Sequence, residues 1–130
     1  MNEFGRWLRV VLAALITSAV GSCASSRVET AAPIETTDRG VVTVVRAPLE
    51  RTAEWTTRAF QDLGIRLNGL ESDPDAREYQ GTREDLNVRA ALRREPPDRT
   101  RIEVTARNGE ETLDQAYARK ILARIARNER

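Results

Sequence analysis

The stretch that decides the fold is LNVRAALRREPPDRTRIEVTAR, residues 86–107. Apolar and polar side chains alternate from Leu86 to Arg93 and again from Arg101 to Arg107, the period of a strand with one buried face. A turn is expected between them at residues 95–98, so the two strands should pair antiparallel. The solvent face of this pair would carry charged side chains, namely Arg89, Arg93, Arg101, Glu103 and Arg107.

Further strands are expected on the N-terminal side of this pair. Residues 41–45 read VVTVV, a β-branched run typical of a strand with both faces at least partly covered. Residues 65–70 and 77–82 suggest a weaker hairpin around the turn-forming residues 71–75, with Gly81 as a bend or bulge. The sequence therefore predicts a sheet of four or five strands.

Two helices complete the domain. Residues 48–63 carry apolar side chains at intervals of three and four, and Gly64 follows where a helix would end. Residues 110–128 place Leu113, Tyr117, Ile121 and Ile125 at four-residue steps, with acidic residues at the start and basic residues at the end. The order predicts a small α+β domain over residues 41–128: an antiparallel sheet with two helices packed on one face and an Arg-rich face uncovered.

The N-terminal residues are typical of an export signal. Arg6 and Arg9 precede an apolar run over residues 10–20, and small residues follow it. Eleven residues span roughly 16 Å as a helix, about half of a bilayer's hydrocarbon core, which disfavours a permanent transmembrane anchor. A buried core helix is the alternative, but it would lie beside two charged arginines. We expect residues 1–22 to be a signal peptide, with cleavage between Ser22 and Cys23.

The residues Val20-Gly21-Ser22-Cys23 resemble the lipobox of bacterial lipoproteins. The resemblance implies that Cys23 receives a diacylglyceryl group and that its new amine is acylated, as with palmitate. Two or more acyl chains give stable membrane anchoring. A free cysteine after ordinary cleavage is the alternative, since a single cysteine cannot form an internal disulfide. Ala24, in place of an aspartate, is similar to the enterobacterial pattern for outer-membrane sorting; the inner membrane is the alternative.

Residues 23–40 are expected to be a lipidated cysteine and a flexible tether. From Ala24 to Gly40 the chain has no aromatic residue and neither helical nor strand period. Seventeen residues of flexible coil have a root-mean-square reach of roughly 20–25 Å, enough to hold the domain clear of a membrane. Alternatively, Val28 or Ile34 packs on the edge of the domain.

Four short motifs follow one another along the chain, and their order carries a resemblance to known proteins: RAPLER at 46–51, DLGI at 62–65, REYQGTR at 77–83 and RKILARI at 119–125. Together with the lipobox, this order resembles small bacterial lipoproteins known as a domain of unknown function. More distantly, it is similar to the helix-grip domains of the lipoprotein component C of the outer-membrane β-barrel assembly machinery. The resemblance implies a protein of the bacterial cell envelope and brings no catalytic residues with it.

Composition argues against most catalytic and metal-dependent functions. The chain has no histidine and one cysteine, which excludes a Cys/His metal site and the commonest general base. Lys and Arg number 21 against 20 Asp and Glu, so no strong field favours nucleic acid. A Ser72–Lys120 pair is formally possible. Four acids around one turn could bind calcium, although a solvated turn is the simpler interpretation: Glu71, Asp73, Asp75 and Glu78. We expect no enzyme, no cofactor and no metal.

Two surfaces are candidates for binding. The arginines of the uncovered sheet face, Arg89, Arg93 and Arg101, together with Glu103, could dock an acidic partner, or could form a solvated, salt-bridged face. Trp55 could anchor a partner, or could belong to the core. The leading hypothesis is a non-enzymatic, lipid-anchored envelope lipoprotein that faces the periplasm and binds or scaffolds another envelope component. The alternative is a lipoprotein that binds a small amphiphile or senses envelope stress.

Overall fold

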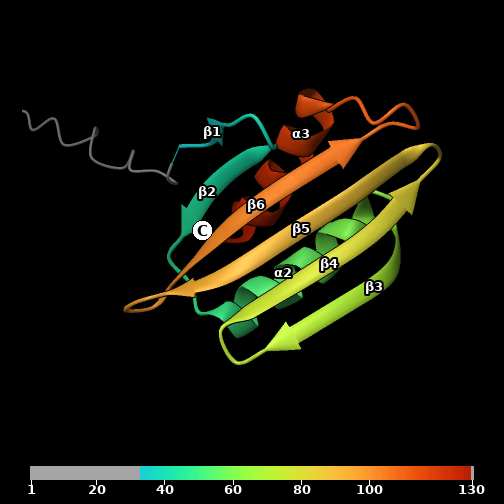
Figure 1. Ribbon diagram of the computed structural model, residues 1–130. Helices are drawn as coiled ribbons and strands as arrows, with labels where there is room; N and C mark the ends of the chain where they lie inside the picture. Colours follow the sequence, from blue (N-terminus) through green and yellow to red (C-terminus); the bar gives the residue numbers. More distant parts are fainter. Residues whose placement is uncertain (1–32, 130) are drawn as a thin grey trace, which may run out of the picture. The chain divides into compact units, whose positions relative to one another are not determined.

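The alternating pattern of residues 86–107 forms the two central strands of the sheet. The structure is a computed structural model and describes residues 33–129. Its elements are β1 (Glu35–Thr36), β2 (Val41–Val45), α2 (Leu49–Asp62), β3 (Arg66–Asp73), β4 (Ala76–Arg83), β5 (Leu86–Glu95), β6 (Arg99–Arg107), α3 (Gln115–Ala126) and a final 3-10 turn, Arg127–Glu129. The six strands are antiparallel in the order β1-β2-β6-β5-β4-β3, and both helices cover one face (Figure 1). The predicted α+β fold is confirmed.

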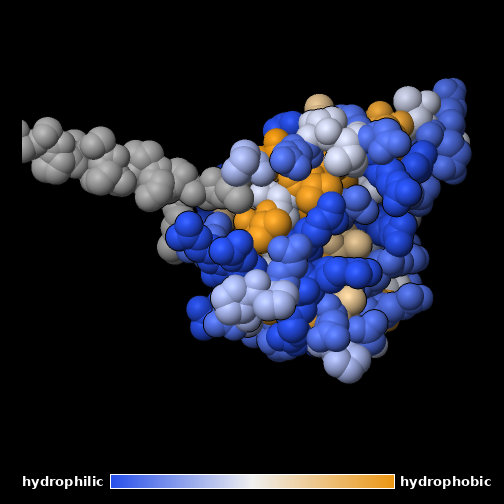
Figure 2. All heavy atoms as spheres, turned by 60° about the vertical axis from the view of Figure 1, so that its left-hand side comes forward, coloured by the Kyte–Doolittle hydropathy of each residue, from blue (hydrophilic) through white to orange (hydrophobic). Residues whose placement is uncertain are grey.

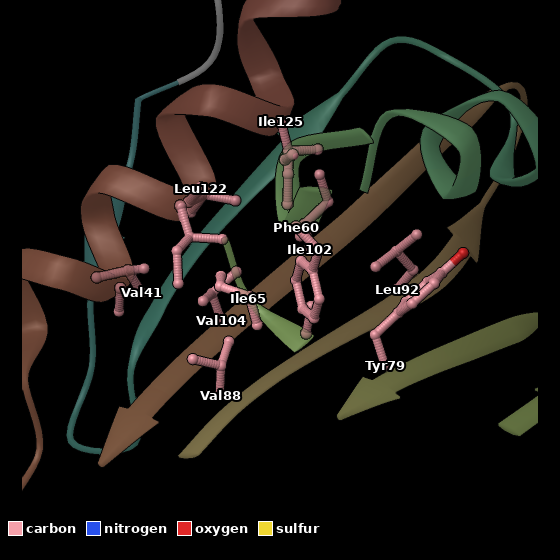
Figure 3. Packing of buried hydrophobic residues seen from close by; sticks show 14 of the residues in the cluster. Val41, Phe60, Ile65, Tyr79, Val88, Leu92, Ile102, Val104, Leu122 and Ile125 are labelled. Carbon is pink, nitrogen blue, oxygen red and sulfur yellow. The ribbon is translucent and has the colours of Figure 1, made fainter. Parts of the chain in front are cut away.

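The core lies between the sheet and the helices. Alternate residues of β5 and β6 turn inward and are almost fully buried: Val88, Ala90 and Leu92 on β5, with Ile102, Val104 and Ala106 on β6. Ile121, Leu122 and Ile125 of α3 are fully buried against them, as the four-residue spacing predicts for Ile121 and Ile125. Figure 3 shows the larger of these side chains between the two layers, with Val88, Leu92, Ile102, Val104, Leu122 and Ile125 labelled. The core is mostly aliphatic, with Phe60 and Tyr79 as its buried rings.

The second helix begins five residues later than the sequence predicts. Asn108 Oδ1 accepts hydrogen bonds from the backbone N–H groups of Glu110 and Thr112, which closes a turn. Leu113 then pairs with Arg107 as an isolated β-bridge, and the Asp114 side chain caps α3 by accepting from Tyr117 N–H. The prediction was wrong here because Leu113 fits the four-residue spacing although it lies outside the helix.

The folded part of the chain also begins earlier than predicted. Glu35 and Thr36 form β1 beside β2, and Ile34 packs against the core. Arg119 of α3 donates a hydrogen bond to the Thr36 hydroxyl at 2.6 Å. The alternative that Ile34 packs on the domain is therefore confirmed, and the tether cannot include residues 34–36. Residues 1–32, which hold the predicted signal peptide, Ser22, Cys23 and Val28, lie outside the described residues.

The predicted bulge at Gly81 is wrong, and the irregularity lies in the partner strand. The register shifts between Leu67 and Gly69 of β3, whereas Gly81 pairs regularly within β4. A Cβ at Gly81 would lie 2.7 Å from Ile65 Cγ2 and 2.8 Å from the Arg66 carbonyl oxygen. Gly81 is therefore required by the close approach of the α2–β3 connection.

Candidate functional site

The sheet has one face that no helix covers. Because side chains alternate along a strand, the residues between the buried ones project to this side. Figure 1 shows both helices behind the sheet, which leaves this side uncovered. We call this surface the open face. Its charged side chains on β3 to β6 include Glu71, Asp73, Glu78, Arg89, Arg93, Glu95, Arg99, Arg101, Glu103 and Arg107.

The charges on the open face are sorted into rows that cross the strands. Arg93 of β5 lies directly opposite Arg101 of β6, and we call these two residues the basic row. Two residues along the strands, Glu103, Ala91, Glu78 and Glu71 are aligned from β6 to β3. We call Glu71, Glu78 and Glu103 the acidic row. Two residues of strand span about 6.8 Å, so the rows are immediate neighbours.

A shallow hollow lies over the two rows. Its volume is about 440 Å³, and its lining includes Ala76, Ala91, both arginines of the basic row and all three glutamates of the acidic row. Ala76 and Ala91 are small and sit beside long charged side chains, which leaves the space between those side chains unfilled. The hollow is thus a property of the side-chain pattern on a regular sheet.

A second hollow lies on the other part of the open face. Its volume is about 650 Å³, and it shares Arg89 and Glu103 with the first. Arg39, Gln80, Asn87 and Arg107 are among the polar residues that line it. Arg89 and Glu103 therefore stand on the boundary between the two hollows.

One arginine of the open face is neutralised within the domain. Arg89 Nη2 lies 2.6 Å from Glu78 Oε2, across β5 and β4. The hydrogen bond from Arg89 lowers the pKa of Glu78, a second one from Gln80 adds to the effect, and the same pair raises the pKa of Arg89. A cross-strand Arg–Glu pair is therefore present, but the partner is Glu78 and not Glu103.

The basic row is not neutralised in this way. Arg93 and Arg101 are exposed, and neither forms an ion pair or side-chain hydrogen bond with any residue in 33–129. Like charges directly opposite each other on neighbouring strands are destabilising. Each guanidinium presents donors in a planar fork that matches a carboxylate or phosphate. The basic row can therefore accept an anionic group from outside the domain.

Trp55 does not belong to the open face. It lies on α2, on the opposite side of the sheet, where it is half-buried against the core. Asp62, two helical turns later on the same stripe, forms an ion pair with Arg124 of α3 at 3.0 Å. Trp55 is thus on the side of α2 that faces α3. The structure separates the two surfaces that the sequence offered as candidates.

The acids of the β3–β4 hairpin and the Ser72–Lys120 pair are the other candidate sites. Asp73 accepts a hydrogen bond from Asp75 N–H in the β3–β4 turn, and Asp75 lies 3.3 Å from Arg94. Within residues 33–129, no three acids come together in a way that could hold a metal ion. Ser72 lies on β3 and Lys120 on α3, and no hydrogen bond joins them.

Sequence reasoning missed the acidic row. Glu71 was expected in the turn at residues 71–75, but the structure places it on β3. Glu78 lies on β4, as expected for residues 77–82, and both carboxylates project from the open face. The two faces of β4 can be assigned from the buried Tyr79. Neighbouring residues of a strand project to opposite sides, so Glu78 must lie on the open face.

The side of the domain that carries β1 and β2 is mainly hydrophilic. Figure 2, seen from the side where β1 and β2 lie, shows a small apolar area surrounded by hydrophilic side chains. In the part of the chain that the structure describes, no helix combines the length and apolar character needed to cross a membrane.

No family model matches this chain, and no curated protein matches it either.

Proposed function

We propose that this chain is a non-enzymatic, lipid-anchored lipoprotein of the bacterial cell envelope whose open face binds an anionic group of another envelope component. The domain acts as a binding or scaffolding module, and the lipid on Cys23 holds it at the membrane, with the outer membrane as the expected location. Catalysis has no part in this function.

The observation that carries the binding proposal is the basic row. Arg93 and Arg101 lie directly opposite each other, and neither forms an ion pair within residues 33–129. An anionic partner would relieve their repulsion and form bidentate hydrogen bonds with both. The hollow of about 440 Å³ beside them offers room for the partner's side chain or headgroup.

The membrane part of the proposal rests on the N-terminal sequence. An apolar run too short to span a bilayer is followed by Val20-Gly21-Ser22-Cys23, which resembles a lipobox. The expected mature protein begins at Cys23 and partitions with membranes. Intact mass of the membrane fraction tests this step, because each added acyl chain changes the mass. An unlipidated mature protein, or unchanged membrane partitioning of Cys23→Ala, would refute the anchor without touching the binding proposal.

The binding step is tested by crosslinking in the native envelope and identification of the captured component by mass. Arg93→Glu combined with Arg101→Glu should abolish capture and leave the melting curve nearly unchanged, because both side chains are exposed. The matched control is Arg51→Glu combined with Arg58→Glu, which makes the same charge change on the exposed side of α2. Capture that survives the first variant places the docking surface elsewhere, first of all around Trp55.

A further inference from the structure

The open face is complementary to itself. The basic row and the acidic row lie side by side and run parallel across the strands. A two-fold axis that lies in the interface, parallel to the rows and midway between them, exchanges their positions. It would place the basic row of one copy over the acidic row of a second copy, and the reverse at the same time, as an isologous interface requires.

This operation gives specific residue pairs. An axis parallel to the rows keeps each strand over the same strand of the second copy, with the direction reversed. On β6, Arg101 would therefore face Glu103 of the second copy. On β5, Arg93 would face Ala91 of the second copy, with Glu78 and Glu103 of that copy on either side of it.

The hollow supports this arrangement. It lies over Ala91 and is lined by Glu78 and Glu103, so it offers the incoming Arg93 both space and carboxylates. Glu103 forms no ion pair within residues 33–129, whereas Glu78 would be shared between the incoming Arg93 and Arg89 of its own copy. Its volume of about 440 Å³ leaves room for an arginine side chain and some water. One row further out on β5, Arg89, which is already paired with Glu78 of its own copy, would face Glu95 of the second copy.

The size of the face is sufficient for a specific interface. The four strands β3 to β6, spaced by about 4.8 Å and eight to ten residues long, cover roughly 550 Å². Two such faces would bury on the order of 1,100 Å², just above the roughly 1,000 Å² that a specific interface needs. The unfavourable contact in this arrangement is Asp73 over Glu71 of the second copy. Both side chains are exposed on the edge strand β3, where water and salt screen their repulsion.

We propose that the open face binds a second copy of this chain as a two-fold dimer, with the basic row of each copy on the acidic row of the other. The proposal uses the surface of the proposed function but requires no envelope partner. A dimer of this kind would hide the basic row, so the anionic partner and the second copy compete for it. Because charged pairs dominate the contact, association should weaken as salt increases.

The test is co-purification of two full-length chains that carry different affinity tags, in detergent and with a reducing agent to prevent disulfides through Cys23. The wild-type chains should co-purify. Arg93→Glu/Arg101→Glu should lose pairing with itself by about tenfold or more, because both reciprocal contacts become repulsive. Glu78→Arg/Glu103→Arg should lose pairing with itself for the same reason. A mixture of these two variants should pair again, since residues 93 and 101 of each chain then face opposite charges at residues 78 and 103 of the other.

Arg51→Glu/Arg58→Glu is the control and should pair like the wild type. The proposal would be overturned if each charge-reversal variant still paired with itself. It would also be overturned if the two variants did not pair with each other when mixed. A circular dichroism melt of each variant shows whether it is folded, and the mixture decides the outcome even if one variant is less stable. Loss of dimers together with continued capture of an envelope component would refute this inference alone. Dimers that follow the charge swap without any such capture would refute the proposed function alone.

Discussion

Arg93 on β5 and Arg101 on β6 occupy directly opposite positions on neighbouring antiparallel strands, and both side chains project from the open face. Neither is paired with a carboxylate anywhere in residues 33–129. Two like charges in this relationship lower stability. The same two charges provide two adjacent bidentate donors. We infer that the pair serves to bind an anionic group, and that its repulsion slightly lowers the stability of the domain.

Replacing one member of this pair should therefore stabilise the domain. Arg101→Glu places an opposite charge across from Arg93, and we expect the free energy of unfolding to rise by about 0.2–1 kcal/mol. Urea unfolding at neutral pH, with the protein dilute enough to be monomeric, measures the change. Arg58→Glu, with the same charge change on α2, should have little effect. A clear loss of stability in Arg101→Glu would show that Arg101 has a structural role.

The Arg89–Glu78 pair predicts a specific pH dependence. Hydrogen bonds from Arg89 and then from Gln80 hold the pKa of Glu78 below its ordinary value of 4.5. The folded state then binds this proton less tightly than the unfolded state, so the pair stabilises the domain above about pH 4.5 and loses its effect as the pH falls through the folded pKa. The contribution should not exceed about 1 kcal/mol, because Arg89 is well exposed. In Arg89→Gln, an NMR titration of the Glu78 carboxyl should show a higher pKa; an unchanged pKa would contradict the assigned cause.

The close packing at Gly81, which is visible only in the structure, predicts that a larger residue at this position is destabilising. Gly81→Ala should lower the free energy of unfolding by about 1–3 kcal/mol, because the new methyl would force Ile65, the Arg66 carbonyl or Phe60 to move. Chemical denaturation measures this. Gly109→Ala is the matched control, since nothing lies within 4 Å of the position that its Cβ would occupy. Equal effects of the two substitutions would mean that the α2–β3 connection does not lie against Gly81.

Ile121 tests the packing of the helix layer. Its side chain is fully buried, so Ile121→Asp should unfold the domain by placing an unpaired charge among aliphatic side chains. Ile121→Ala should fold but lose about 2–5 kcal/mol. Circular dichroism and urea unfolding distinguish these outcomes. Lys120→Ala, at the exposed neighbouring position, should change stability by less than about 0.5 kcal/mol.

The sequence was most informative where one face of an element is buried and the other is solvated. Residues 86–107 alternate cleanly, and the structure confirms both the antiparallel pair and the arginines on its open face. Residues 35–36 form a strand too short to show any period, so β1 was missed. Leu113 misled the helix prediction because it has the right spacing, whereas the turn at Asn108 depends on hydrogen bonds that hydrophobic spacing does not encode.

The candidate site was predicted in part for the same reason. Alternation within β5 and β6 places Arg89, Arg93, Arg101 and Glu103 on one surface, but the alignment of these residues with Glu71 and Glu78 depends on the register of four strands. Register is fixed by turns and by core packing, which no single segment reveals. The rows, the hollow and the separation of Trp55 from the arginines therefore required the three-dimensional structure.

The central claim is that the open face, and not the helix layer, binds other molecules. The most direct measurement is photo-crosslinking in native envelopes with a photo-reactive residue in place of Ala91, on the open face, or of Arg58, on α2. We expect crosslinked products from position 91 and few from position 58. The products from position 91 should disappear when Arg93→Glu and Arg101→Glu are added. Products mainly from position 58, or an unchanged yield from position 91 in the charge-reversed chain, would contradict the account.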